Sequence, residues 1–135
     1  MHARFFDTNV LAYVAGADPR KAALARGALA DGGTISVQVL NELANVANRK
    51  MRMDWAEVLS FIGTIRPLVT VVPLTVETHS LGLTLAERHR LPVYDAMIAA
   101  AGLLAGCEVL MSEDFQHGFV FAGQMRVENP FQEVA

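Results

Sequence analysis

Short segments that are apolar throughout alternate with longer segments of helical periodicity along most of this chain, and this alternation limits the possible fold more than any other feature. Such segments predict parallel strands that are covered by helices on both faces of the sheet. We therefore expect an α/β fold of three layers, α/β/α, around a mostly parallel sheet of four to five strands. The predicted strands are Arg4–Phe6, Thr34–Ser36, Val69–Leu74 and Val109–Met111, with Met125–Val127 as the fifth.

The segments between these strands carry helix start and stop signals. Asp18 followed by Pro19 provides an N-cap and a first helical residue for a helix that continues through Leu29. Asp54 with Glu57 resembles a capping box, which begins a helix that should end before Pro67. Further helices are expected over Val10–Val14, Val37–Arg49, Thr75–Arg90 and Ala96–Leu104, the last of them opened by Asp95.

Composition narrows the class of protein. A chain of 135 residues with 53% hydrophobic residues fits one domain, here 1–135, with a single core. The net charge of -3 argues against nucleic-acid binding through bulk electrostatics, so any such binding must be local. The single cysteine, Cys107, cannot form an internal disulfide, and no segment has the roughly 20 apolar residues of a membrane helix. We expect a cytoplasmic protein that does not enter a membrane.

Acidic residues occur where a parallel sheet would hold a ligand. Asp7 ends the first strand, Glu42 lies two turns into the helix after the second strand, Asp95 begins a buried helix, and Asp114 follows the fourth strand. Ligands of such sheets bind beyond the carboxyl ends of the strands, so all of these side chains can reach one rim. Carboxylates about 6 Å apart repel by roughly 3 kcal/mol per pair at an effective dielectric constant near 20. No lysine or arginine is near these acids in sequence, so a divalent cation such as Mg²⁺ is the natural counter-charge.

Each acid also has an ordinary structural interpretation. Asp7 and Asp95 could be helix N-caps, Asp114 a turn residue, and Glu42 a solvated position on a helix. The functional hypothesis therefore depends on the convergence of all four residues on one sheet edge.

The segments around these acids resemble the motifs of a known family. They look like the four acidic motifs of the PIN-domain family, in the same order and with similar spacing, and Asn129-Pro130-Phe131 resembles the closing strand of its VapC-type toxin branch. The matching segments are Phe6-Asp7-Thr8-Asn9-Val10-Leu11, Ile35-Ser36-Val37-Gln38-Val39-Leu40-Asn41-Glu42-Leu43, Tyr94-Asp95-Ala96-Met97-Ile98-Ala99-Ala100-Ala101 and Leu110-Met111-Ser112-Glu113-Asp114-Phe115.

The resemblance implies a Mg²⁺- or Mn²⁺-dependent endoribonuclease of PIN-like fold that cleaves RNA. It further implies the toxin of a type II toxin–antitoxin pair, a homodimer that a cognate antitoxin silences. Hydrolysis by water that the ion activates would need no protein nucleophile. The residues carried over as catalytic groups and metal ligands are Asp7, Glu42, Asp95 and Asp114, with Thr8 or Ser112 supplying a hydroxyl and Asn9 holding the carboxylates in place.

Gln116 departs from the family pattern, because many members carry a further aspartate at this position. One strong metal site is therefore expected, and a tightly bound second ion is not.

The sequence leaves two other functions open. One is an inactive PIN-like interaction module, which would not need all four acids. The other is a Mg²⁺-dependent phosphatase-like enzyme. Such enzymes usually carry Asp-x-Asp after the first strand, and here Asn9 occupies the position of the second aspartate, which disfavours this function.

Partner surfaces are less clearly marked in the sequence. The basic cluster Arg49-Lys50-Met51-Arg52 could bind an RNA backbone or an acidic segment of an antitoxin, or be a solvated helix end. Several apolar residues exceed what one core needs and could line a homodimer seam or an antitoxin groove: Leu24, Leu29, Trp55, Phe61, Phe119 and Phe121.

Overall fold

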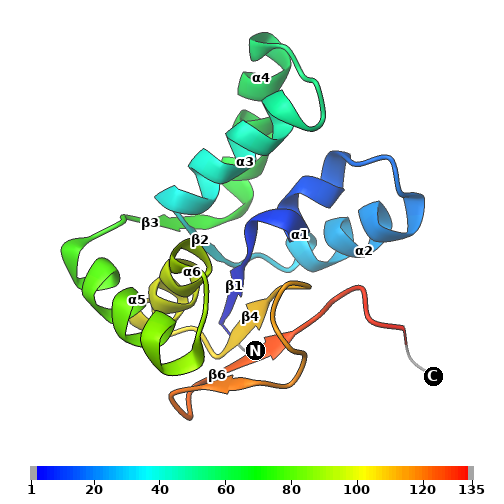
Figure 1. Ribbon diagram of the computed structural model, residues 1–135. Coiled ribbons are helices and arrows are strands. Elements are labelled where there is room, and N and C mark those ends of the chain that lie inside the picture. Colours follow the sequence, from blue (N-terminus) through cyan, green and yellow to red (C-terminus); the bar gives the residue numbers. More distant parts are fainter. Residues whose placement is uncertain (1–2, 134–135) are drawn as a thin grey trace.

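The computed structural model describes residues 3–133, which form an α/β fold around a mixed sheet (Figure 1). The strand order is β3-β2-β1-β4-β6-β5, and each neighbouring pair is parallel except β5 with β6. From β1 the chain adds β2 and then β3 on one side, and it then crosses to the other side of β1 to form β4. The order of the strands therefore reverses at β1, which lies between β2 and β4. The strands are β1 (Arg4–Phe6), β2 (Thr34–Ser36), β3 (Thr70–Val72), β4 (Val109–Met111), β5 (Val120–Phe121) and β6 (Met125–Glu128).

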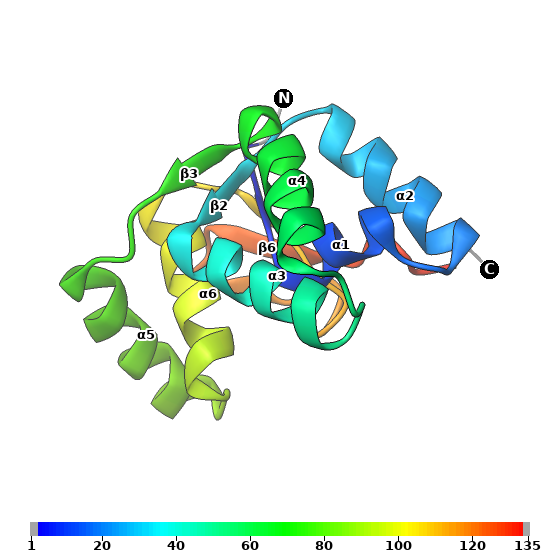
Figure 2. The same cartoon turned by 90° about the horizontal axis from the view of Figure 1, so that it is seen from above.

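Helices lie on both faces of this sheet, as the alternating pattern predicted. Figure 2 shows α5 and α6 on one side of the sheet and α1 and α2 on the other, while α3 and α4 project together in Figure 1. Short 3₁₀ turns follow α1 at Tyr13–Ala15 and α4 at Arg66–Leu68. The helices are α1 (Thr8–Ala12), α2 (Pro19–Ala30), α3 (Val37–Arg49), α4 (Trp55–Ile65), α5 (Val76–His89) and α6 (Val93–Leu104).

The predicted helix caps are present. Asp18 accepts a hydrogen bond from Lys21 N (3.1 Å), and Asp54 and Glu57 form the complete reciprocal capping box of α4. The start of α6 was predicted wrongly, because the helix begins at Val93 and has Pro92 as its N-cap. Asp95 therefore lies in the first turn of α6 and is not the N-cap.

The edge strand β5 is the sixth strand, one more than expected. It pairs with β6 through a tight turn in which Ala122 (φ 52°) and Gly123 (φ 65°) both have positive φ. The N–H of Gln124 donates to Phe121 O (2.9 Å) and closes this turn. Alanine rarely adopts positive φ, so the usual Asn-Gly or Asp-Gly signal of such a turn is missing from the sequence.

The core packs around β1, whose Phe5 and Phe6 are fully buried. Helices α5 and α6 approach closely at Gly82, where a Cβ atom would lie 2.4 Å from Met97 Sδ. This contact packs α5 closely against α6, the helix that carries Asp95.

The apolar residues that seemed surplus to one core divide between interior and surface. Leu29 and Phe121 are buried, Phe61 and Phe119 are half-buried, and Leu24 and Trp55 are exposed. Only the exposed ones are thus open to a partner. Within residues 3–133, the helices are all too short or too polar to span a bilayer.

Candidate active site

The topology brings Asp7 and Asp114 to adjacent strand ends. Asp7 follows β1 and Asp114 follows β4, and these parallel strands pair with Phe6 opposite Met111. The N–H of Asp7 continues the ladder by donating to Met111 O (3.0 Å). This is the point where the strand order reverses, the usual ligand position in open α/β sheets.

Asp7 is buried, with 4% of its surface exposed, and both of its carboxylate oxygens accept hydrogen bonds. Oδ1 accepts from the N–H of Thr8 (2.7 Å), and Oδ2 accepts from the hydroxyl of Ser112 (2.7 Å). Asp7 is also the N-cap of α1. Its structural role as a cap and its place in the acidic site are therefore combined in one residue.

Burial raises the pKa of Asp7 from 3.8 to about 6, and the nearby charges of Asp114 and Asp95 add to this effect. The hydrogen bonds from Ser112 and Thr8 act in the opposite direction, because they stabilise the charged form. Asp7 is thus a buried carboxyl group whose negative charge its surroundings disfavour.

Asp114 is held by a short chain of polar contacts. Asn9 Nδ2 donates to Asp114 Oδ2 (3.0 Å), and the N–H of Asp114 donates to Ser112 Oγ (3.0 Å). Ser112 thus links Asp7 to the backbone of Asp114. The predicted supporting residues Asn9 and Ser112 each contact one of the predicted acids.

Glu42, in α3, faces the same site and is also bound at both oxygens. Thr8 Oγ1 donates to Glu42 Oε1 (2.7 Å), and Gln38 Nε2 donates to Glu42 Oε2 (2.9 Å). Gln38 Nε2 also donates to Tyr94 O (2.9 Å), one residue before Asp95. Gln38 was not singled out in the sequence, although its position four residues before Glu42 places both side chains on one face of the helix.

Asp95 has no hydrogen bond to its carboxylate among the described residues. Partial burial raises the pKa of Asp95, followed by the charges of Asp114 and Glu42. Asp7 is influenced in the same way by Asp114 and Asp95. The four predicted acids are therefore close enough to influence one another's charge.

None of the four acids forms an ion pair with a basic side chain of residues 3–133. The ion pairs found within residues 3–133 are Arg4–Asp31 (3.6 Å) and Lys21–Glu113 (3.0 Å), and neither includes one of the four acids. Carboxylate oxygens are the ligands that Mg²⁺ and Mn²⁺ prefer, so the donor set suits a hard divalent cation. In the described part of the chain, however, no three His, Cys, Asp or Glu side chains are already arranged to hold a metal ion.

A second polar cluster holds the loop that carries Asp114 from its other side. Glu113 accepts hydrogen bonds from the Tyr13 hydroxyl and from Lys21 Nζ (3.0 Å), and Lys21 Nζ lies 4.5 Å from the centre of the Tyr13 ring. Phe131 packs edge-on against Tyr13 (4.9 Å between ring centres). Glu113 is therefore engaged by Tyr13 and Lys21. No local sequence pattern marks this cluster, because Glu113 and Phe131 are roughly a hundred residues from Tyr13 and Lys21.

The basic cluster Arg49-Lys50-Met51-Arg52 lies at the end of α3 and in the turn that follows it. Arg49 is in the last turn of the helix, and Arg52 has positive φ (57°). Glu42 is seven residues earlier in the same helix, which corresponds to about 10 Å along the axis.

Comparison with known families identifies the class of protein. The PIN domain matches residues 4–118 of the chain, which include all four predicted acids. The chain therefore belongs to the PIN-domain family. A search of curated proteins gave no match.

Solved structures support the same fold at low sequence identity. FitAcB from Neisseria gonorrhoeae is 18% identical with a TM-score of 0.70, covering 96% of this chain and 99% of that one. A toxin–antitoxin complex from Klebsiella pneumoniae is 19% identical with a TM-score of 0.69, covering 95% and 98%. VapC20 of Mycobacterium tuberculosis, described as a toxin that cleaves the sarcin–ricin loop, is 21% identical with a TM-score of 0.67, covering 80% and 87%.

Proposed function

We propose that this protein is a Mg²⁺- or Mn²⁺-dependent endoribonuclease, a cytoplasmic toxin of a type II toxin–antitoxin pair whose 135 residues form one nuclease domain. The observation that carries the proposal is the shared site of four carboxylates, beside β1 where the order of the strands reverses, with no basic partner among the described residues. Such a site is poorly suited to a packing role, because each added negative charge raises the cost of ionising the others.

Asp7, Glu42, Asp95 and Asp114 would hold the divalent cation. When bound, the cation would lower the pKa of water and neutralise charge on the phosphate. The chain's own residues orient the carboxylates: Ser112 and the Thr8 N–H fix Asp7, while Asn9 fixes Asp114. The Asp95 carboxylate accepts no hydrogen bond from residues 3–133, and Asp95 lies in the first turn of α6, where the helix dipole favours negative charge.

Charge repulsion also sets how substrate would enter. An RNA phosphate would be repelled by four ionised acids, so the cation and the phosphate are expected to bind together. Gln116 offers no carboxylate for a second ion, which supports a single tightly held cation.

The test is cleavage of a generic single-stranded RNA by the purified protein. We expect cleavage with Mg²⁺ or Mn²⁺, none with EDTA, and a loss of at least 100-fold in Asp95→Asn. The matched control is Asp31→Asn, which changes an exposed aspartate outside the site and should cleave like the original protein. Cleavage that survives both EDTA and Asp95→Asn would refute the proposal. Absence of any cleavage would favour the inactive interaction module.

We further propose that an antitoxin binds the exposed apolar surface of α4. Trp55 and Leu59 are 65% and 72% exposed and lie one helical turn apart, so they form one strip. Trp55→Ser with Leu59→Ser should weaken the complex with the protein encoded next to this gene, measured by co-purification, while cleavage by the free protein is retained.

A homodimer is proposed as well, and light scattering should give twice the mass of the 14.6 kDa chain.

A further inference from the structure

A cavity of about 220 Å³ adjoins Asp114 on the side of the sheet that α5 and α6 cover. Its walls come from the end of α5 and the turn after it, from the segment that connects β4 with β5, and from β5 itself. Four of its lining side chains carry rings, and Gln116 provides an amide. The lining residues besides Asp114 are His89, Leu91, Phe115, Gln116, Phe119 and Phe121. We call this cavity the aromatic pocket.

The rings of the aromatic pocket are fixed by packing against one another. Phe121 is buried and contacts Phe119, Phe115 and His89 edge-on, with ring centres 4.7, 5.7 and 5.6 Å apart. Phe115, Phe119 and His89 remain half-buried, so part of each ring is accessible. A pocket with rings already in place loses little conformational entropy when a flat ligand enters.

We propose that the aromatic pocket binds one unpaired nucleobase of the RNA, next to the phosphate that is cleaved. This inference rests on the proposed nuclease function. Sequence-specific recognition of single-stranded RNA uses stacking of splayed bases on aromatic side chains together with hydrogen bonds to the base edges. Asp114 belongs both to the acidic site and to the wall of the pocket, which places the base directly beside the reacting phosphate.

The size and polarity of the pocket fit a single base. Drug-sized ligands usually occupy about 300–1,000 Å³, so a cavity of about 220 Å³ suits one planar ring system and not a dinucleotide. The Gln116 amide offers both donors and an acceptor, as bidentate recognition of a base edge requires. A neutral amide at this position also avoids the repulsion that a further aspartate would exert on an RNA strand.

The alternative is that these rings only stabilise the hairpin of β5 and β6. The two roles predict different results. A packing role affects cleavage of every RNA equally, whereas a base pocket alters the preference for a base at one position of the substrate.

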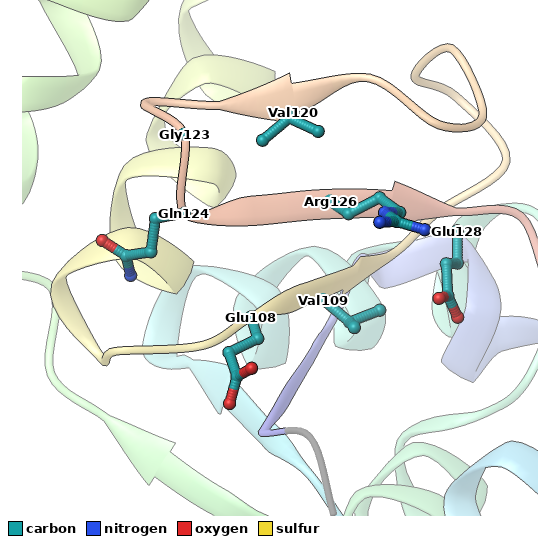
Figure 3. A pocket seen from close by; sticks show the side chains of 7 residues that line it. All are labelled: Glu108, Val109, Val120, Gly123, Gln124, Arg126 and Glu128. Atoms are coloured by element: carbon teal, nitrogen blue, oxygen red, sulfur yellow. The ribbon is translucent and has the colours of Figure 1, made fainter.

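The strand offers a matched control for this test. Val120 lies between Phe119 and Phe121 but points to the opposite face of the sheet, because side chains alternate along a strand. There it lines a separate cavity with Gly123 and Arg126 (Figure 3). Val120→Ala therefore perturbs the same hairpin without touching the aromatic pocket.

The experiment maps cleavage of a randomised single-stranded RNA in Mn²⁺ by the original protein, Phe119→Leu, Gln116→Ala and Val120→Ala. We expect a base preference at one position flanking the cleaved bond. Phe119→Leu and Gln116→Ala should each lower cleavage of RNAs with that base by about 5- to 150-fold, the range expected for loss of one stacking contact or of one bidentate hydrogen-bonded pair. RNAs with other bases there, and Val120→Ala on all RNAs, should change little. No preference, or an equal loss on every RNA, would overturn the proposal.

A binding measurement separates this proposal from the proposed function. The Asp95→Asn variant is used because we expect it not to cleave, and its binding of a labelled RNA with a single abasic residue is compared with its binding of the intact RNA. We expect the abasic residue to weaken binding by about 5- to 150-fold when Phe119 is present and not in the added Phe119→Leu background. An abasic effect of equal size in both backgrounds, or none at all, refutes the pocket. If the original protein cleaves no RNA but the Phe119-dependent effect is found, only the nuclease function fails.

Discussion

Ser112 donates its hydroxyl to Asp7 across 105 residues of sequence, at 2.7 Å, and so ties the end of β4 to the end of β1. The same oxygen accepts the N–H of Asp114. One hydroxyl thus orients the most buried acid of the site and the loop that carries the most exposed one.

Ser112→Ala should weaken divalent-ion binding. Burial is the main cause of the raised pKa of Asp7, and the Ser112 hydrogen bond opposes it, so its loss raises that pKa further. A cation must then displace a proton from Asp7 at neutral pH. We expect Mn²⁺ affinity to fall by about 10- to 100-fold in calorimetric titrations, and the rise of activity with pH to move to higher pH. Ser60→Ala, on the exposed side of α4, is the control. Unchanged Mn²⁺ affinity in Ser112→Ala would contradict this role.

Asp7→Asn should stabilise the metal-free protein at high pH while abolishing cleavage. Folding raises the pKa of Asp7 from 3.8 to about 6, so the folded state favours its protonated form. The resulting contribution of Asp7 to the free energy of unfolding is therefore present below about pH 4 and is lost as the pH rises through about 6. A shift of this size corresponds to about 3 kcal/mol. Urea unfolding in EDTA should show that the stability difference between variant and original protein grows in favour of the variant over this pH range. A constant difference would refute the assignment.

Thr8→Val removes the hydroxyl that holds Glu42 and keeps the shape of the side chain. Glu42 loses one of its two hydrogen-bond donors, and we expect kcat to fall by about 10-fold or more, as for other residues that orient metal ligands. Thr8→Ser, which retains the hydroxyl, should restore most of this loss. If Thr8→Ser is as impaired as Thr8→Val, packing and not the hydrogen bond is responsible.

Two glycines within helices should respond oppositely to alanine. Gly63, in α4, has open space around it, so Gly63→Ala should stabilise the protein by up to about 1 kcal/mol through helix propensity. Gly82→Ala would place its Cβ 2.4 Å from Met97 Sδ and 3.3 Å from Met97 Cα, and overpacking of this kind costs about 1–3 kcal/mol. Thermal unfolding of both variants measures the contrast. Equal shifts in Tm would show that α5 and α6 can move apart freely.

The sequence was most informative where a structural rule is local. The ends of β1 and β4 were predicted because each apolar segment stops shortly before an acid, Asp7 in one case and Asp114 in the other. The capping box of α4 was predicted from Asp54 and Glu57, which are three residues apart. The rule that parallel strands share a carboxyl edge brings Asp7 and Asp114 together. Glu42 and Asp95 lie on helices that begin at the same edge, so their convergence also depends on how far into each helix they stand.

The contacts that hold the acids were harder to predict, because they join distant segments. Gln38 bridges Glu42 in α3 to Tyr94 in α6, and a glutamine on a helix gives no sign of a partner 56 residues away. The strand β5 was missed because it has two residues and its turn uses Ala122 in an unusual conformation. Asp95 was placed at a helix start because Pro92 was expected to end the preceding structure, whereas it serves as the N-cap.

The position of β6 bears on where this chain can be shortened. The segment matched to the PIN domain ends at residue 118, but β6 pairs with β4 beyond that point. A chain cut there would leave the backbone amides and carbonyls of β4 bare along one side and would open Val109, Leu110 and Met111 to water. Unprotected edges of this kind promote self-association into aggregates. The last strands, β5 and β6, thus protect the edge of β4, the strand that precedes Asp114.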